Sequence, residues 1–152
     1  MAIEKKDAFI KQMAIFLGNR QYEDAYGLGR EFAAKFPADM VSHYLLAKAA
    51  FWTGKYEEAL AEGRKAFNLA SGPDINACAV ITASAYYSLG RYPEGYELLS
   101  SIKTKGDEDL EKLKFIFAMV MGREKEAVEC LDDLFRINRK AAEKLLEKAL
   151  LE

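Results

Sequence analysis

A short motif that returns at nearly constant spacing constrains this sequence more than any other feature. Its four copies are RQYEDA (20–25), GKYEEA (54–59), GRYPEG (90–95) and GREKEA (122–127), and their last residues are 34, 36 and 32 positions apart. This spacing is close to the length of a repeat made of two helices joined by a turn. The sequence therefore predicts an array of helix pairs and no sheet.

Each position of the motif has a physical role in such a turn. The leading glycine can take the positive φ that ends a first helix, and the small last residue lets a second helix lie close to the first. The tyrosine can pack over the turn. Pro93 falls in the first turn of its second helix, where the missing N–H costs nothing. Between the motifs the apolar residues have helical spacing, as at Leu45, Leu46, Ala49 and Ala50.

This pattern resembles the tetratricopeptide repeat (TPR) family, most closely over residues 40–73, which contain small residues, the turn motif and a closing proline in family register. Other repeats depart from it, with Arg20 in place of the turn glycine, Gly95 in place of alanine and Glu124 in place of tyrosine. The resemblance implies an all-α fold, a right-handed superhelical array of about four helix-turn-helix repeats in a single domain, 1–152. The repeats are expected at about 6–39, 40–75, 76–107 and 108–138, with a capping helix at 139–152.

The predicted capping helix has an apolar face and a charged remainder, which suits the open end of a repeat stack. A partner-binding helix or a helix lying on a membrane surface is the alternative. The predicted apolar face comprises Ala142, Leu145, Leu146, Ala149 and Leu150.

Composition disfavours several classes of function. The formal net charge is −2 and basic residues alternate with acidic ones, so no basic stripe for nucleic acid stands out. Charged residues or glycines interrupt every apolar stretch well before the roughly 18 residues of a membrane span, and the charged start lacks the apolar core of a signal peptide. We therefore expect a cytoplasmic protein with no membrane insertion, in which Cys78 and Cys130 are reduced and serve as small buried hydrophobes.

Motifs of catalysis are missing from the sequence, which contains no GxGxxG, phosphate loop, HExxH, GxSxG or CxxC. With His43 as its one histidine, the chain cannot build a multi-histidine metal site. Packing within the helices is the expected role of His43, and a pH switch is the alternative. We expect no enzyme activity, no metal and no cofactor.

The TPR resemblance also implies a working surface, because the first helices of successive repeats line a concave groove in that family. Family members that grip a chaperone's carboxylate tail use basic residues and asparagines there, whereas the ninth positions here are Ala14, Lys48, Ser84 and Ile116. A groove with aromatic and apolar residues instead suits an extended or helical protein segment with apolar anchors. The predicted groove residues are Tyr44, Lys48, Phe51, Trp52, Ser84, Tyr87, Lys112 and Ile116.

Two alternatives to this interpretation stay open. A rotation of one helix position would turn Phe51 or Trp52 inward, making them core residues. The chain could also be a structural subunit that self-associates or docks through its ends or convex face, with no peptide-binding groove. In that case Ala8, Phe9, Met13 and Phe16 of the first helix would form an interface, and a homo-oligomer is possible.

Overall fold

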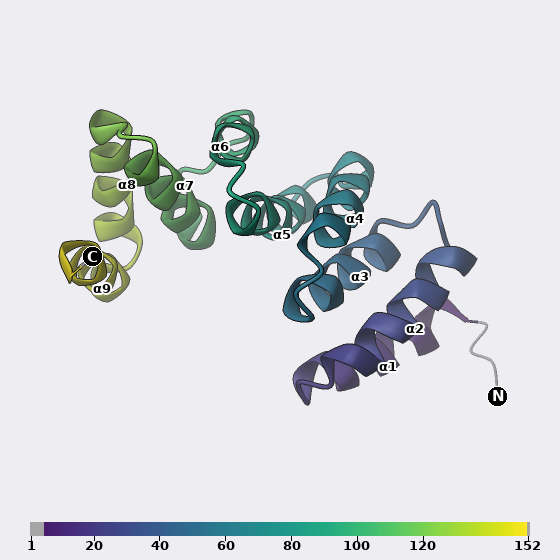
Figure 1. The fold of residues 1–152 in the computed structure, drawn as a ribbon. Coiled ribbons are helices and arrows are strands. Elements are labelled where there is room, and N and C mark those ends of the chain that lie inside the picture. Colours follow the sequence, from purple (N-terminus) through teal and green to yellow (C-terminus); the bar gives the residue numbers. More distant parts are fainter. Residues whose placement is uncertain (1–4, 152) are drawn as a thin grey trace. The chain divides into compact units, whose positions relative to one another are not determined.

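The computed structural model describes the backbone of residues 5–151 and the side chains of residues 5–149. Every regular element in that range is a helix (Figure 1). The predicted all-α helical-repeat fold is confirmed. The helices are α1 (Lys6–Gly18), α2 (Tyr22–Lys35), α3 (Met40–Trp52), α4 (Tyr56–Leu69), α5 (Asp74–Ser88), α6 (Tyr92–Ser100), α7 (Glu108–Val120), α8 (Glu124–Ile137) and α9 (Arg139–Leu151).

The helices group into two compact units that divide between Leu89 and Gly90. The first unit contains α1 to α5, and the second contains α6 to α9. The third repeat is thus divided, because α5 belongs to the first unit and α6 to the second. That residues 1–152 act as a single domain stays a prediction.

The four motif copies adopt a common backbone conformation, which confirms the register read from the sequence. The residue expected to have a positive φ has one in every copy: Arg20 (59°), Gly54 (81°), Gly90 (72°) and Gly122 (72°). Three of the turns also close with the same hydrogen bond, in which an N–H reaches back to the carbonyl five residues earlier. These 2.8 Å bonds join Gln21 to Phe16, Lys55 to Ala50 and Arg123 to Ala118.

The core at the start of the first unit is aromatic. Phe9 of α1 stacks on Phe32 of α2, with ring centroids 4.9 Å apart, and Phe36 meets both rings edge-on. Phe9 and Met13 are fully buried against the first unit's own helices. In the alternative in which the start of α1 forms an interface, these two residues therefore cannot take part, because they are already buried.

The helix α9 is present where the capping helix was predicted, and it packs against α8. Ala142 is fully buried, and Leu145 and Ala149 are half-buried. Leu146, which the sequence pattern placed on the same face, is 37% exposed, and the side chain of Leu150 lies outside the described residues. The apolar face of α9 is thus narrower than the pattern indicated.

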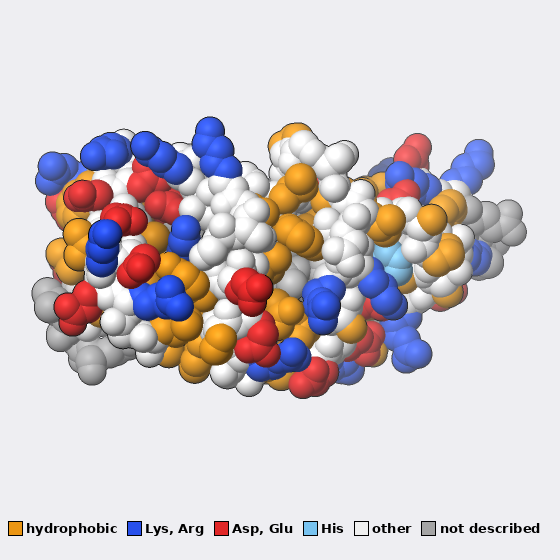
Figure 2. All heavy atoms as spheres, turned by 90° about the horizontal axis from the view of Figure 1, so that it is seen from above, with side chains coloured by type: hydrophobic (Ala, Val, Ile, Leu, Met, Phe, Trp, Pro, Cys, Tyr) orange, Lys and Arg blue, Asp and Glu red, His pale blue; other side chains and the backbone are white. Residues whose placement is uncertain are grey.

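Positive and negative side chains are interspersed on the surface shown in Figure 2, with hydrophobic side chains between them. Between residues 5 and 151, no helix is both long enough and apolar enough to cross a bilayer. The cytoplasmic location stays a prediction.

Candidate functional site

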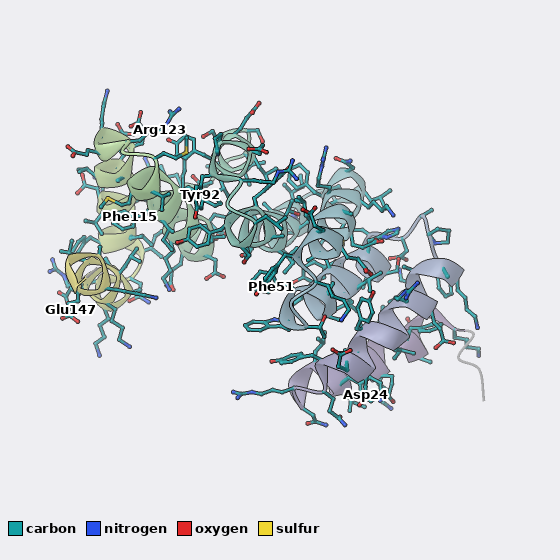
Figure 3. The ribbon with its side chains drawn as sticks, in the orientation of Figure 1. Asp24, Phe51, Tyr92, Phe115, Arg123 and Glu147 are labelled. Atoms are coloured by element: carbon teal, nitrogen blue, oxygen red, sulfur yellow. The ribbon has the colours of Figure 1, made fainter. Side chains whose placement is uncertain are left out.

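Four aromatic side chains gather at the end of α3 in the first unit, around Phe51 (Figure 3). Trp52 stacks on Tyr22, with centroids 5.6 Å apart and planes 16° apart, and it meets Phe51 edge-on at 5.5 Å. Phe51 in turn meets Tyr56 at 5.4 Å. We call Tyr22, Phe51, Trp52 and Tyr56 the aromatic cluster.

The repeat geometry builds this cluster. Trp52 is the last residue of α3, and the turn at Gly54 brings the chain back so that α4 begins at Tyr56, beside Phe51. Tyr22 is the first residue of α2, so it occupies the same position in its repeat as Tyr56. The tyrosines of two successive turns therefore flank the end of one helix.

The aromatic cluster reaches the surface. Trp52 is 56% exposed and Tyr56 is 36% exposed, whereas Phe51 and Tyr22 are half-buried. An indole so exposed leaves a large apolar area open to solvent, and its stacking on Tyr22 restrains the ring. The rotation of α3 is thus the one that brings Trp52 to the surface, and not the alternative that would turn it inward.

The other predicted groove residues of the first unit lie on α3 and α5, which contact each other. The Lys48 ammonium is 5.4 Å from the centre of the Tyr44 ring, within cation–π range. Tyr87 is 39% exposed. The Ser84 hydroxyl donates to the Val80 carbonyl at 2.7 Å, so its proton is already used within α5.

The remaining two predicted residues lie in the second unit, on α7. The Lys112 ammonium pairs with the Glu108 carboxylate at 2.9 Å, one helical turn away, and Ile116 is half-buried. The predicted site residues are thus divided between the two units. Within the first unit, the structure brings Phe51 next to Trp52 and Tyr44 next to Lys48.

Two members of the aromatic cluster, Tyr22 and Tyr56, were not predicted as site residues. The turn motif predicted only that a tyrosine at this position packs over the turn. Trp52 is the signal that could have found Tyr22, since a large side chain at the end of a first helix can meet the tyrosine of the preceding turn.

A polar network joins α2 and α4, the two helices that carry the tyrosines of the aromatic cluster. The Tyr26 hydroxyl donates to the Glu58 carboxylate at 2.6 Å, and this hydrogen bond raises the pKa of Tyr26 above its ordinary 10.0. The Lys55 ammonium sits 4.6 Å from the centre of the Tyr26 ring. These contacts join α2 to the start of α4 and fix the two elements that supply Tyr22 and Tyr56.

His43 is buried, as predicted for a packing residue, and both of its ring nitrogens have partners. Nδ1 lies 2.6 Å from the Glu62 carboxylate, and Nε2 lies 2.6 Å from the Pro37 carbonyl oxygen. Because a carbonyl oxygen can only accept, Nε2 is the donor in that contact. His43 therefore ties α3 to α4 and to the loop that precedes α3.

Both cysteines are buried and free, which confirms their predicted role. Burial raises the pKa of the Cys78 thiol to about 11 and that of the Cys130 thiol to about 12. Because the thiolate is the reactive form, neither residue has the character of a nucleophile. Over the described residues, there is also no group of three or more His, Cys, Asp or Glu side chains placed to hold a metal ion.

The second unit buries two carboxyl groups between α7 and α8. Glu111 lies beside Asp133 and the Thr104 hydroxyl, and the Gly106 N–H donates to Asp133 at 2.9 Å. Burial raises the pKa of Glu111, and the neighbouring Asp133 carboxyl adds to the shift. Thr104, Glu111 and Asp133 line a surface pocket of about 390 Å³, and its other lining residues are Cys130 and side chains of both signs of charge.

Taken together, stacked helix pairs with a common turn and an exposed aromatic side chain at the end of α3 define the class of helical-repeat proteins. Residues 18–102 match the family model described as anaphase-promoting complex, cyclosome, subunit 3. The chain belongs to this family, whose repeats are of the TPR type.

Solved structures agree on the fold. A crystal structure of MamA superposes with a TM-score of 0.78 at 17% identity, covering 92% of this chain and 82% of that one. A thermophilic TPR protein of Thermus thermophilus, TTC0263, gives 0.76 at 15% identity, covering 95% and 83%. No curated protein sequence matched the chain. At these identities the structural likeness establishes the fold.

Proposed function

We propose that this chain is a protein-interaction module of the adaptor, scaffold or chaperone-like kind, which binds a segment of another protein on the first helices of its repeats and the turns that follow them. In the first unit this surface comprises the aromatic cluster, with Tyr44 and Lys48 on α3 and Ser84 and Tyr87 on α5. The TPR-type fold supports an interaction role in general. The proposal includes no catalytic role and no cofactor.

The observation that carries the proposal is the exposed, restrained ring of Trp52. A side chain that is 56% exposed and stacked on Tyr22 loses little freedom when a partner covers it. Tryptophan and tyrosine are also the residues most enriched among those that dominate binding energy at interfaces. The aromatic cluster is therefore the best anchor point in the first unit.

The chemistry of this surface suggests the kind of segment that binds. The aromatic rings favour an extended or helical segment with a large apolar side chain. Lys48, held over the Tyr44 ring, can orient a carboxylate of the same segment. Extension of the binding surface to Lys112 and Ile116 of the second unit stays a prediction.

The test is a pull-down with the wild-type chain and with Tyr44→Ala/Trp52→Ala, followed by mass spectrometry of the retained proteins. Leu69→Ala is the matched control, because Leu69 is a 45% exposed apolar residue at the end of α4 outside the aromatic cluster. Circular dichroism first establishes that all three proteins are equally helical. We expect a partner that both wild type and Leu69→Ala retain and that the double variant loses.

A second readout uses Trp52 itself, the single tryptophan of the chain. Binding of the captured partner should shift its fluorescence to shorter wavelength, since the exposed indole becomes buried. Identical partners in all three pull-downs, with unchanged fluorescence, would show that the aromatic cluster is not the binding site.

The alternative, a structural subunit that self-associates, is supported by exposed apolar residues in the second unit. Met119 and Val120 at the end of α7 are 49% and 47% exposed, and Val128 on α8 is 59% exposed. Light scattering coupled to size-exclusion chromatography separates the two functions. An oligomer that dissociates in Val128→Lys but persists in Tyr44→Ala/Trp52→Ala would favour the structural role.

A further inference from the structure

The second unit contains a pocket whose rim is formed largely by lysines. It has a volume of about 420 Å³ and lies between α7 and α9. Lys112 contributes from α7, and Lys140, Lys144 and Lys148 contribute from α9. We call these residues and the space between them the lysine pocket.

The helix geometry aligns the three lysines of α9. They are four residues apart, so they form a row along one face, with neighbours separated by roughly 6 Å along the axis. Ala141 and Leu145 lie beside the row and give the pocket an apolar floor. Figure 3 shows α9 with Glu147, which is not among the residues that line the pocket.

One side chain fixes α9 to α7 at this pocket. Asn138, just before α9, accepts a hydrogen bond from the Ala141 N–H at 3.2 Å. Its amide group also donates to Glu108 of α7 at 2.9 Å. The start of α9 and the first turn of α7 are thus held together, so the lysine pocket is a built feature of the second unit.

The charges of the lysine pocket are unbalanced. Glu108 is the one acidic residue that lines it, and hydrogen bonds from Lys112 and Asn138 lower its pKa, so it is ionised and already paired. Lys140, Lys144 and Lys148 have no acidic partner among the described residues. The chain as a whole is slightly acidic, with a net charge of −2, so this concentration of positive charge is local.

Among residues 139–149, α9 carries four basic residues and two acidic ones, Glu143 and Glu147. Like charges one turn apart repel each other, and a cation near the start of a helix opposes the helix dipole, as Lys140 does. An anion bound between the lysines would relieve both effects.

We propose that the lysine pocket binds an acidic segment of a partner protein, whose carboxylates pair with Lys140, Lys144 and Lys148 while its methylene groups rest on Ala141 and Leu145. In an extended segment, alternate side chains are roughly 7 Å apart, which matches the spacing of the lysine row. A nucleic acid suits the site less well, because no aromatic ring lines the described pocket to stack a base. This inference does not depend on the aromatic cluster.

The test measures binding of a fluorescent peptide with glutamates at alternate positions, separated by serines, by anisotropy at low and at physiological salt. We expect binding that weakens as salt rises and that falls about tenfold or more in Lys140→Gln/Lys144→Gln/Lys148→Gln. The control Lys11→Gln/Lys103→Gln/Lys125→Gln removes the same charge from three exposed lysines elsewhere. It should bind as the wild type does.

Three outcomes would overturn the proposal: equal losses in the two triple variants, equal binding of a peptide with glutamine in place of glutamate, or tighter binding of a single-stranded oligonucleotide. The variant Tyr44→Ala/Trp52→Ala is measured in parallel. Because the lysine pocket and the aromatic cluster share no residue, that variant should bind the acidic peptide normally even if the proposed function fails.

Discussion

The two units use different residues at one equivalent position of their second helices, four residues after the small residue of the turn motif. In the first unit this position is glycine, at Gly29 of α2 and Gly63 of α4. In the second unit it is leucine, at Leu99 of α6 and Leu131 of α8. Leu99 is fully buried, so in the second unit a side chain packs at a position where the first unit has only backbone.

The glycines permit a close approach between a second helix and the first helix of the next repeat. A Cβ at Gly29 would lie 3.2 Å from the Leu46 Cα, and a Cβ at Gly63 would lie 2.7 Å from the Thr82 hydroxyl oxygen. That hydroxyl is fixed by a 2.7 Å hydrogen bond to the Cys78 carbonyl. The same repeat pattern therefore supports two packing modes, one by backbone contact and one by interposed side chains.

The largest expected effect comes from filling this close approach. Gly63→Ala should lower the free energy of unfolding by about 1–3 kcal/mol, because the new methyl group overpacks against buried Thr82. Gly27→Ala is the control: Gly27 is an exposed position of α2 with nothing within 4 Å of its Cβ. It should stabilise the protein by about 0.5–1 kcal/mol through helix propensity. Urea denaturation measures both.

A double variant locates the cause. Thr82→Ala removes the atom that Gly63→Ala would strike, so the two substitutions together should cost less than the sum of their separate effects. Simple additivity, or a Gly63→Ala protein as stable as Gly27→Ala, would mean that the helices move apart easily. The difference in helix packing between the two units would then have no effect on the free energy of unfolding.

The helix caps give the next largest effect. Asp39 accepts a hydrogen bond from the Val41 N–H at 2.8 Å at the start of α3 and pairs with Lys6, whereas Asp107 caps α7 through the Leu110 N–H at 3.1 Å. Asp39→Ala should lower the free energy of unfolding by about 1–2 kcal/mol. This loss should exceed that of Asp107→Ala, because Asp39→Ala also removes the carboxylate that pairs with Lys6 of α1. Thermal melts of the two variants under the same conditions provide the comparison.

The pH dependence of the Asp39 contribution has a definite sign. Burial alone would raise the pKa of Asp39, but hydrogen bonds from Lys6 and the Val41 N–H outweigh burial, and the pKa lies below its ordinary 3.8. The stabilisation is therefore complete above the ordinary value and is lost as the pH falls through the lowered one. A stability gap between wild type and Asp39→Ala that persists unchanged at the lowest accessible pH would contradict this assignment.

Much of the fold could be predicted from the sequence because the turn motif carries strong local constraints. A positive φ, a small buried residue and a proline in a first helical turn are all local requirements, and the structure has each where it was expected. The division between Leu89 and Gly90 has no such local signal, since Gly90 and Tyr92 fit the repeat pattern as well as Gly54 and Tyr56 do.

The candidate site was less predictable because side-chain contacts between repeats depend on how the helices are placed in space. Phe51 and Trp52 follow from the register of one helix, but the stacking of Tyr22 on Trp52 joins residues of two repeats. Likewise, Ser84 has a predicted groove position, yet its hydroxyl donates its proton to the Val80 carbonyl. The lysine row of α9 can be identified from the sequence, whereas the pocket that it forms with α7 cannot.

A smaller effect is expected at the one turn that lacks its glycine. Arg20 has a φ of 59°, in a region that disfavours side chains, whereas Gly122 occupies the equivalent turn of the second unit at 72°. Arg20→Gly should stabilise the protein by up to about 1 kcal/mol, and Gly122→Ala should destabilise it by about the same amount. If denaturant titrations gave both substitutions the same sign, turn strain would not be what distinguishes these repeats.

The smallest expected effect contrasts the buried carboxyls of the second unit with Asp39 of the first. Burial and the adjacent Asp133 hold the pKa of Glu111 above its ordinary 4.5, so the fold favours its protonated form more than the unfolded chain does. Its contribution is therefore complete below 4.5 and is lost as the pH rises through the raised value. Glu111→Gln cannot ionise, and its amide can still donate to Asp133. We expect it to raise the melting temperature by a few degrees at pH 7 and to leave it nearly unchanged near pH 4. Equal shifts at both values would indicate a packing effect, because a change in ionisation must vanish where Glu111 is protonated in both the folded and the unfolded chain.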